Sequence, residues 1–374
     1  MPRRFFTVLC SGLLATSTLF YTPAAQATPQ QLGDLTVLAT TDTHAHALDH
    51  DYITDQPFGL KNPSQAKGMD RLSSAIKQIR AEQGPESVLL LDNGDANQGS
   101  NLASYYQQSR TPTSMDPMAK VLNHLDYDAV AAGNHEFNYG LAALNQYKNN
   151  LAMPFLASNV IDLASGKPAY TPYTIVSKTV GGQPVKIGVI GVVTPRVALW
   201  DNKHVGGKLR FDDAVAAVKT WEPVVKDAGA DLVVVLAHTG LDPEGADYQE
   251  ELKGDNVARS VAEQTKDVDL VIGGHTHVRN KVEEFFTNAE GEQVLYTQPG
   301  YWASFLSEVS LPLVSNEQTG RPEVNWSKQG PQPQARAVLA QDYQPDRAIW
   351  FAAEPYHSQA RAWTRQGGAA KKNG

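Results

Sequence analysis

Five short polar clusters, each directly after an apolar run, contain the residue types of a metal site. They supply carboxylates, imidazoles and an amide carbonyl, which are ligands that borderline divalent metals prefer. Any one cluster is an ordinary turn or strand end, but all five together predict a shared metal centre. The clusters are Asp42-x-His44, Gly94-Asp95-x-x-Gln98-Gly99, Gly133-Asn134-His135-Glu136, Ala237-His238 and Gly274-His275-Thr276-His277.

The spacing indicates how a first metal would be held. Asp42 and His44 are separated by one residue, so on an extended segment both side chains face the same side. We expect His277 to return to this site. Asp95 follows an apolar run closely, and its two carboxylate oxygens could bridge to a second metal.

A second metal would be completed by Asn134, His238 and His275. Paired metals about 3.5–4 Å apart stabilise the attacking and leaving oxygens of an in-line displacement at phosphorus and activate water near neutral pH. His135 need not bind metal, because a histidine beside the phosphate can protonate the departing alkoxide. Glu136 either orients this loop or is an exposed turn residue. Manganese, zinc, iron and cobalt all suit this ligand set.

Continuous apolar runs precede the clusters and are bounded by Gly, Asn and Asp. Such runs predict strands buried on both faces. Ligands gather at the carboxyl ends of strands in open α/β sheets, so we expect the clusters to converge there. The runs cover residues 35–39, 88–91, 129–132, 155–157, 187–193, 232–237 and 270–272.

Helical patterns lie between these runs. Leu72, Ile76 and Ile79 follow helical spacing, Asp116-Pro117 is expected to begin a helix, and Asp212 is expected to cap another one. The alternation of strands and helices predicts an α/β layered fold.

The pattern changes after residue 280. Shorter, partly alternating strands are expected at 282–286, 294–296 and 305–311, consistent with a second sheet. Residues 348–363 form one ambiguous segment. We therefore expect a catalytic domain over 28–345 and a linker-like tail over 346–374.

The N-terminus has the pattern of a secretory signal peptide. Arg3 and Arg4 precede an apolar stretch, and a small-x-small cleavage pattern ends at Ala27. The alternative, a membrane anchor, is disfavoured because the stretch is short. A signal peptide over residues 1–27 that is removed after export predicts a periplasmic or otherwise exported protein without stable membrane insertion. Cys10, the only cysteine, leaves with the signal, which excludes disulfides.

The formal net charge is −8. An acidic chain without a basic stripe is poorly suited to binding duplex nucleic acid. The charge therefore predicts no nucleic acid polymer as partner, while the paired metals predict a small phosphate ester as substrate; the nucleotide class is what the resemblance described next implies. The sequence leaves the oligomeric state open.

Residues 93–100 and 133–141 resemble motifs of the calcineurin-like metallophosphoesterases, over about residues 35–345. With the stretch from Ile187 to Asn202, they are similar to the periplasmic branch that opens 2',3'-cyclic nucleotides and then hydrolyses 3'-nucleotides. The resemblance implies a four-layer α/β sandwich, with two mixed sheets packed face to face and helices outside. It implies His135 as the catalytic histidine, with Asn134 and His135 near the substrate. It places Asp42, His44, Asp95 and His277 on the first metal, and Asp95, Asn134, His238 and His275 on the second.

Two departures from the family pattern qualify this expectation. Related 5'-nucleotidases have an aspartate at the position of Asn138, and a neutral amide there fits the cyclic-phosphodiesterase branch better. Members of this branch also have a C-terminal domain that stacks the nucleobase, and we expect its absence to weaken nucleotide binding. The alternatives are a 5'-nucleotidase, a sulfur-ester hydrolase, or a non-catalytic metal-binding remnant.

Overall fold

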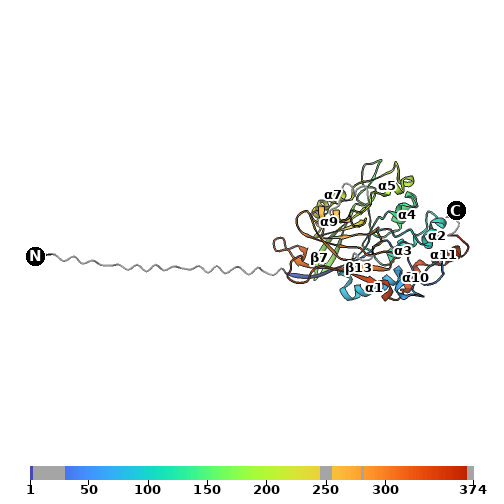
Figure 1. Ribbon diagram of the computed structural model, residues 1–374, viewed down its shortest axis with the longest axis horizontal. Helices are drawn as coiled ribbons and strands as arrows, with labels where there is room; N and C mark the ends of the chain where they lie inside the picture. Colours follow the sequence, from blue (N-terminus) through green and yellow to red (C-terminus); the bar gives the residue numbers. More distant parts are fainter. Residues whose placement is uncertain (3–29, 245–254, 279–281, 369–374) are drawn as a thin grey trace.

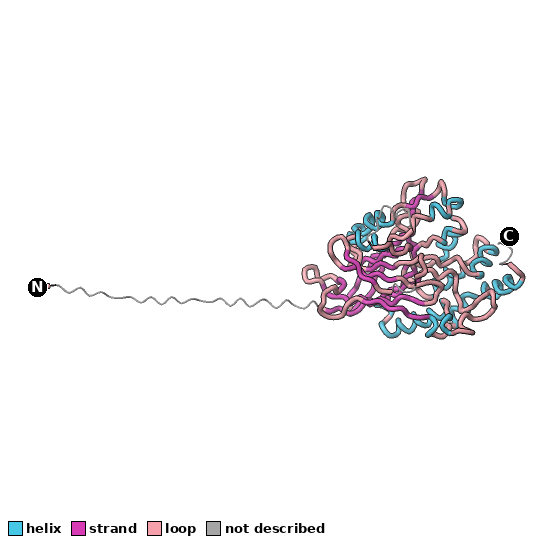
Figure 2. The backbone as a smooth tube through the Cα atoms, viewed as in Figure 1, coloured by secondary structure: helices cyan, strands magenta, loops and turns pink. Residues whose placement is uncertain are grey.

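Two mixed β-sheets form the centre of the molecule, with helices around them (Figures 1 and 2). The computed structural model describes residues 1–2, 30–244, 255–278 and 282–368. The sheets pack face to face through a shared apolar layer, in which Leu89 and Leu91 of one sheet lie with Val234 of the other. The expected α/β arrangement of two mixed sheets with helices outside is confirmed.

The first sheet has the order β14-β13-β1-β2-β3-β4, with β15 also paired to β13. Strands β1 to β4 run parallel, whereas β13 runs antiparallel to β1 and to its other neighbours. The bounds are β1 (Gln31–Thr40), β2 (Val88–Asp92), β3 (Ala129–Ala131), β4 (Phe155–Leu156), β13 (Phe305–Ser315), β14 (Pro322–Val324) and β15 (Gln334–Leu339).

The second sheet has the order β11-β12-β10-β9-β7-β6. Its four central strands are parallel and its two edge strands antiparallel. A separate two-stranded ladder joins β5 and β8. The bounds are β5 (Val160–Asp162), β6 (Tyr173–Val180), β7 (Gln183–Val193), β8 (Leu209–Phe211), β9 (Leu232–His238), β10 (Leu270–Ile272), β11 (Glu284–Thr287) and β12 (Gln293–Thr297).

All seven apolar runs form strands. The expectation of a second sheet made from the three strands after residue 280 is wrong for the last of them. β11 and β12 extend the sheet of β10, but β13 pairs with β1 along most of its length. Apolar side chains of β13 such as Val309 and Leu311 pack in the layer between the sheets. That burial predicts a strand but not which strand it pairs with.

Helices cover the outer face of each sheet. Those on the first sheet are α1 (Met69–Gln83), α2 (Asn101–Ser109), α3 (Pro117–His124), α4 (Leu141–Asn150), α10 (Arg347–Ala353) and α11 (Tyr356–Arg365). Those on the second are α7 (Ala214–Asp227) and α9 (Ala258–Gln264). Shorter helices are α5 (Val197–Trp200), α6 (Asn202–Val205), η1 (Pro63–Gln65), η2 (Pro85–Ser87), η3 (His135–Phe137) and η4 (Ala340–Asp342).

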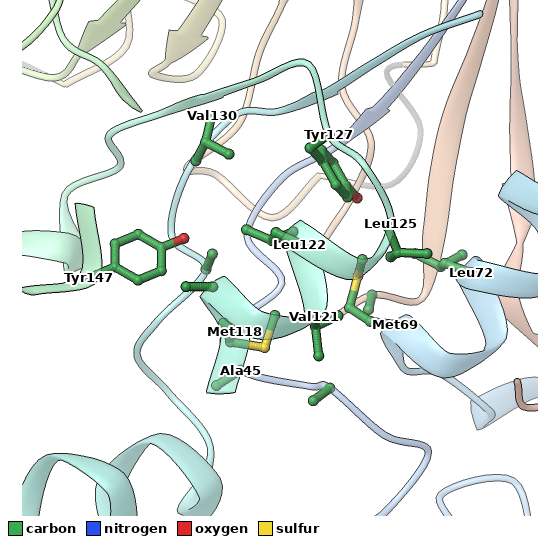
Figure 3. Close-up of a cluster of buried hydrophobic side chains, with 14 of the residues drawn as sticks. Ala45, Met69, Leu72, Met118, Val121, Leu122, Leu125, Tyr127, Val130 and Tyr147 are labelled. Carbon is green, nitrogen blue, oxygen red and sulfur yellow. The ribbon is translucent and has the colours of Figure 1, made fainter. Parts of the chain in front are cut away.

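Helix α3 packs into the apolar cluster beside the first sheet, which Figure 3 shows with Met118 and Leu122 among its labelled side chains. The helix begins as expected, because the Asp116 carboxylate accepts hydrogen bonds from the backbone N–H of Met118 and Ala119 at 2.8 and 3.2 Å. Such a cap satisfies donors that the first helical turn leaves free.

Helix α7 starts one residue later than expected. Its cap is Asp213, which accepts from the backbone N–H of Ala216 at 2.6 Å. Asp212 instead pairs with the guanidinium of Arg210. Two consecutive aspartates give the same capping signal, and only the ion pair distinguishes them.

The segment after residue 346 differs from the expected linker-like tail. It forms α10 and α11, which contact α1, α2 and α3 (Figure 1). Ile349, Ala353 and Ala360 are buried in the same cluster as the first sheet. The apolar run 348–353 shows neither a helical nor a strand period, so the sequence leaves the structure and packing of this segment ambiguous. Residues 369–374 lie outside the described residues.

The predicted signal peptide lies almost wholly within residues 3–29, outside the described residues. Among the described residues, no helix has the length and apolar character needed to cross a bilayer.

Candidate metal centre

The polar clusters meet at one edge of the two sheets. Asp42 follows β1, Asp95 follows β2 and Asn134 follows β3, while His238 ends β9 and His275 follows β10. Within each sheet these strands are parallel, so their carboxyl ends lie at the same edge. The convergence expected from the sequence is therefore present.

One group of potential ligands consists of Asp42, His44 and His277, whose ligand atoms lie within 4.8 Å of one another. His277 Nε2 is 3.3 Å from Asp42 Oδ1 and 3.0 Å from His44 Nε2. Two imidazoles and a carboxylate gathered this closely suit a divalent cation such as zinc or manganese.

A second group consists of Asp95, His238 and His275, again with ligand atoms within 4.8 Å. His238 Nε2 lies 3.0 Å from Asp95 Oδ2. Asn134 adjoins this group, since its Oδ1 accepts a hydrogen bond from His275 Nδ1 at 2.8 Å. Asp95 also lies between the groups, with Oδ2 3.9 Å from His44 Nε2.

Backbone carbonyls orient two of the histidines. His44 Nδ1 lies 2.8 Å from the carbonyl oxygen of Gln98, and His238 Nδ1 lies 2.6 Å from that of Asn93. A carbonyl only accepts, so each Nδ1 carries the proton and donates it. In their neutral form the rings would present an unprotonated Nε2 to the carboxylates, which is the arrangement that metal-binding histidines use.

Two buried atoms in the centre have no hydrogen-bond partner among the described residues. They are Asp42 Oδ1 and His238 Nε2, which lie 3.8 Å apart. The other carboxylate oxygen of Asp42 accepts from the Thr41 hydroxyl and from the backbone N–H of His275. Unsatisfied buried polar atoms are costly. Two of them facing each other fit a centre in which Asp42 Oδ1 would bind one cation and His238 Nε2 its neighbour.

The electrostatics of the centre also favour positive charge. Burial lowers the pKa of His238, but the carboxylates of Asp95 and Asp42 outweigh it and raise that pKa to about 10. Burial raises the pKa of the Asp95 carboxyl, yet His238 and the other imidazoles bring it well below its ordinary value. Without a cation the site thus retains a proton, and divalent ions would displace it.

Many residues of the centre have backbone in the left-handed region of φ and ψ. Asp42 and His44 have φ of 50° and 48°, so they do not lie on the extended segment expected from their spacing, because β1 ends at Thr40. Asp95, His275 and His277 also have positive φ. Such conformations cost of the order of 1–3 kcal/mol each and cluster at functional sites.

Two motif glycines permit the close approach of these loops. Gly94 has φ +90°, and a Cβ there would lie 2.3 Å from the backbone nitrogen of Gly133. A Cβ on Gly274 would lie 2.4 Å from the hydroxyl of Thr41. A larger residue at Gly94 would separate the loop of Asp95 from that of Asn134, and one at Gly274 would separate the loop of His275 from that of Asp42.

Glu136 orients the loop after β2, which was one of the two roles expected for it. Its side chain is buried rather than exposed, with 1% exposure for the residue. Oε2 accepts from the backbone N–H of Asp95 at 2.8 Å and of Gly133 at 2.7 Å, and Oε1 accepts from that of Ala96 at 2.8 Å. One carboxylate therefore joins two of the polar clusters.

His135 lies at the start of η3 and is partly exposed; its ring forms a third group of close potential ligand atoms with His44 and Asp95. Its backbone N–H donates to Asp95 Oδ1 at 2.7 Å, and its ring meets the His44 ring edge-on with centroids 5.2 Å apart. Nδ1 lies 2.6 Å from Asn138 Oδ1. The ring is therefore oriented for chemistry next to the metal groups.

Three residues at the centre were not singled out as site residues from the sequence. Asp255 Oδ2 lies 2.8 Å from His275 Nε2, and this hydrogen bond lowers the pKa of the Asp255 carboxyl. The Trp200 ring stacks on that of His275 with centroids 5.6 Å apart and is 44% exposed. Asp201 accepts from Asn138. These residues follow no apolar run, so no strand-end signal marks them.

The histidines left unassigned from the sequence stay outside the potential ligand groups found among the described residues. His46 stacks on Trp302, and His357 contacts the hydroxyl of Tyr52 at 3.0 Å. The set consists of His46, His50, His124, His204 and His357.

Comparison with known proteins supports a family assignment. The sequence profile described as Calcineurin-like phosphoesterase matches residues 35–279. The chain is 32% identical to the 2',3'-cyclic-nucleotide 2'-phosphodiesterase/3'-nucleotidase of Haemophilus influenzae, over 97% of this chain and 55% of that protein. It is 34% identical to the protein of the same name from Yersinia enterocolitica, over 86% of this chain and 48% of that protein. The chain thus spans about half the length of these curated relatives.

Solved structures agree on the fold. The crystal structure of the calcineurin-like phosphoesterase YfkN from Bacillus subtilis matches with a TM-score of 0.76 at 29% identity, over 90% of this chain and 99% of that one. A 5'-nucleotidase precursor from Thermus thermophilus matches with a TM-score of 0.65 at 23% identity, over 88% of this chain and 60% of that one.

Proposed function

Since the chain belongs to the calcineurin-like phosphoesterase family, we propose that it is a two-metal phosphoesterase acting on 2',3'-cyclic nucleotides and 3'-nucleotides. The observation that carries this proposal is the pair of unpartnered buried atoms, Asp42 Oδ1 and His238 Nε2, among three overlapping groups of histidine and aspartate. The named activity of the curated relatives suggests the substrate class.

Seven side chains would hold the ions. The first ion would be held by Asp42, His44, Asp95 and His277, and the second by Asp95, Asn134, His238 and His275. Two divalent ions, when bound, would supply Lewis-acid stabilisation of phosphoryl charge and an activated water. The neutral amide of Asn134 would limit negative charge next to an anionic substrate.

His135 would act on the leaving oxygen. Its Nδ1 faces the carbonyl oxygen of Asn138, so Nε2 is the atom that can exchange a proton with substrate. In its protonated form Nε2 would donate to the departing 2'-oxygen as the bond from phosphorus to that oxygen breaks. The products of this step are a 2'-hydroxyl and a 3'-phosphate, and hydrolysis of the 3'-ester would follow at the same centre.

A 5'-nucleotidase is the second candidate, because Asp201 lies one hydrogen bond behind the amide that replaces the aspartate of that branch. Among the described residues, no comparable contact favours a sulfur-ester hydrolase. We also propose that the chain is exported, on the basis of the N-terminal pattern in the sequence.

The test is hydrolysis by the purified protein loaded with manganese, cobalt or zinc. Bis(p-nitrophenyl) phosphate reports any phosphodiesterase activity, and a His135→Ala variant is the control for the centre. Turnover by wild type and not by the variant is expected. No turnover with any ion would contradict the proposal and favour a non-catalytic metal-binding remnant.

Product analysis then separates the substrates. We expect 2',3'-cyclic AMP and 3'-AMP to be consumed faster than 5'-AMP. A preference for 5'-AMP would reverse the order of the two candidates.

A further inference from the structure

A carboxylate lies behind His135 at the end of a short hydrogen-bonded chain. His135 Nδ1 is 2.6 Å from Asn138 Oδ1, and Asn138 Nδ2 donates to Asp201 Oδ2 at 2.8 Å. We call the three residues the relay. Asp201 belongs to none of the three potential ligand groups, and it lies 63 positions from Asn138 in the sequence.

The relay determines which nitrogen of His135 carries its proton. An ionised carboxylate only accepts, so Asp201 requires the NH₂ of Asn138 to face it. The carbonyl oxygen of Asn138 must then face His135, and since a carbonyl cannot donate, Nδ1 must hold a proton. Nε2 is left for the substrate.

Without the Asp201 carboxylate, this order is no longer enforced. The Asn138 amide could rotate and present its NH₂ to the imidazole, which would favour the tautomer with the proton on Nε2. That neutral tautomer has its proton on the substrate side but cannot take one up there. The hydrogen bond between Asn138 and His135 would then no longer select a single tautomer of the neutral ring.

The surrounding backbone holds Asp201 independently of its carboxylate. The residue joins α5 to α6 and is 4% exposed. Its backbone N–H donates to the carbonyl of Val197 at 2.9 Å, and its carbonyl accepts from the N–H of His204 at 2.7 Å. A change confined to the carboxylate should therefore leave this corner in place. The neighbouring Trp200 ring, stacked on His275, holds the corner against the metal centre.

We propose that Asp201 is a positioning residue for His135, acting through Asn138 to keep the His135 proton on Nδ1 and Nε2 directed at the leaving oxygen. The inference rests on the proposed hydrolysis for its consequence in catalysis. It does not depend on that function for the tautomer itself.

The kinetic test uses Asp201→Asn with esters that differ in their leaving group. Protonation matters most for a poor alkoxide leaving group and least for p-nitrophenolate. We expect kcat for an alkyl phosphate ester to fall about 10–100-fold, with KM within about 2-fold and a loss below about 3-fold on the p-nitrophenyl ester. Equal losses on the two esters, or none, would overturn the proposal.

The reciprocal double variant Asn138→Asp/Asp201→Asn provides a rescue. It moves the carboxylate directly onto His135 and puts the amide behind it, so the Nδ1 proton is again required. We expect kcat on the alkyl ester to return to within about 3-fold of wild type. Asp227→Asn, on the exposed end of α7, is the matched control and should match wild type on both esters. Failure of the double variant to recover would count against the relay.

A second measurement separates the relay from the proposed function. Nitrogen-15 NMR of labelled histidine in the metal-free protein, with His135→Gln for assignment, reports the tautomer directly. We expect neutral His135 to carry its proton on Nδ1 in wild type and to gain the Nε2–H tautomer in Asp201→Asn. The same tautomer in both proteins would overturn the proposal. Absence of hydrolysis by wild type would instead refute the proposed function, and the tautomer would then decide on the relay alone.

Discussion

Replacing Glu136 with glutamine should affect the metal-loaded protein much more than the metal-free protein. The carboxylate receives backbone N–H bonds from Asp95, Ala96 and Gly133 at 2.7–2.8 Å. A glutamine whose side-chain oxygen replaces Oε2 still accepts from the N–H groups of Asp95 and Gly133. Its NH₂ then faces the backbone N–H of Ala96, and that donor is left without an acceptor. The unsatisfied donor and the loss of charge on the other two bonds together cost about 2–5 kcal/mol.

An opposing effect is larger while the site lacks a cation. Burial, followed by repulsion from Asp95, raises the pKa of the Glu136 carboxyl from 4.5 to about 7. A folded pKa above the unfolded value means that ionisation destabilises the fold as pH rises from 4.5 to 7, by up to about 3 kcal/mol. At pH 8 the neutral glutamine avoids that cost, so the metal-free variant should be within about 2 kcal/mol of wild type.

Bound cations would neutralise Asp95 and remove the repulsion, which is the smaller of the two causes, so the loaded variant would be compensated less than the metal-free one. The difference, about 1–2 kcal/mol, must appear as an affinity for the ions about 5–30-fold weaker. Competition with a chelator at pH 8 measures that affinity, and denaturant unfolding of both forms measures the stabilities. Glu317→Gln, at an exposed turn, is the control. Ion affinity within about 3-fold of wild type would refute the reasoning.

Three further changes test separate parts of the structure. Gly94→Ala puts a Cβ 2.3 Å from the nitrogen of Gly133 at a φ of +90°, so we expect at least about 2 kcal/mol of destabilisation in thermal unfolding, and an unchanged Tm would contradict the packing. Burial and then His50 lower the pKa of His357 from 6.5 to about 4, so the unfolded chain takes up its proton first and stability falls between those pH values. His357→Gln should flatten that fall by about 2 kcal/mol in urea unfolding at pH 7 and 4.5, and an unaltered pH dependence would argue against it. His135→Gln should lower kcat about 10²–10⁴-fold while the bound metal measured by elemental analysis stays the same, and loss of metal would make His135 a ligand instead.

The strand ends of the site could be predicted because burial on both faces leaves a strong local signal. A run such as 232–237 admits no polar residue, so the first histidine after it, His238, marks the end of the strand. Parallel strands bring their carboxyl ends to one edge, and this rule places Asp42 with Asp95 in one sheet and His238 with His275 in the other, whereas the meeting of the two edges follows from how the sheets pack.

The remaining features depend on contacts between distant segments. Asp201 and Asp255 act on Asn138 and His275 through single hydrogen bonds, and nothing in the local sequence distinguishes them from exposed aspartates. The pairing of β13 with β1 is likewise a choice among buried strands that the apolar pattern leaves equal. These features follow from tertiary packing rather than from propensity or periodicity.

Anomalous diffraction from crystals of the manganese-loaded protein tests the central claim most directly. We expect two manganese peaks, one among the side chains of Asp42, His44 and His277 and the other between Asp95 and His238. No bound manganese at these side chains, or manganese bound only elsewhere on the chain, would contradict the assignment of a two-metal phosphoesterase.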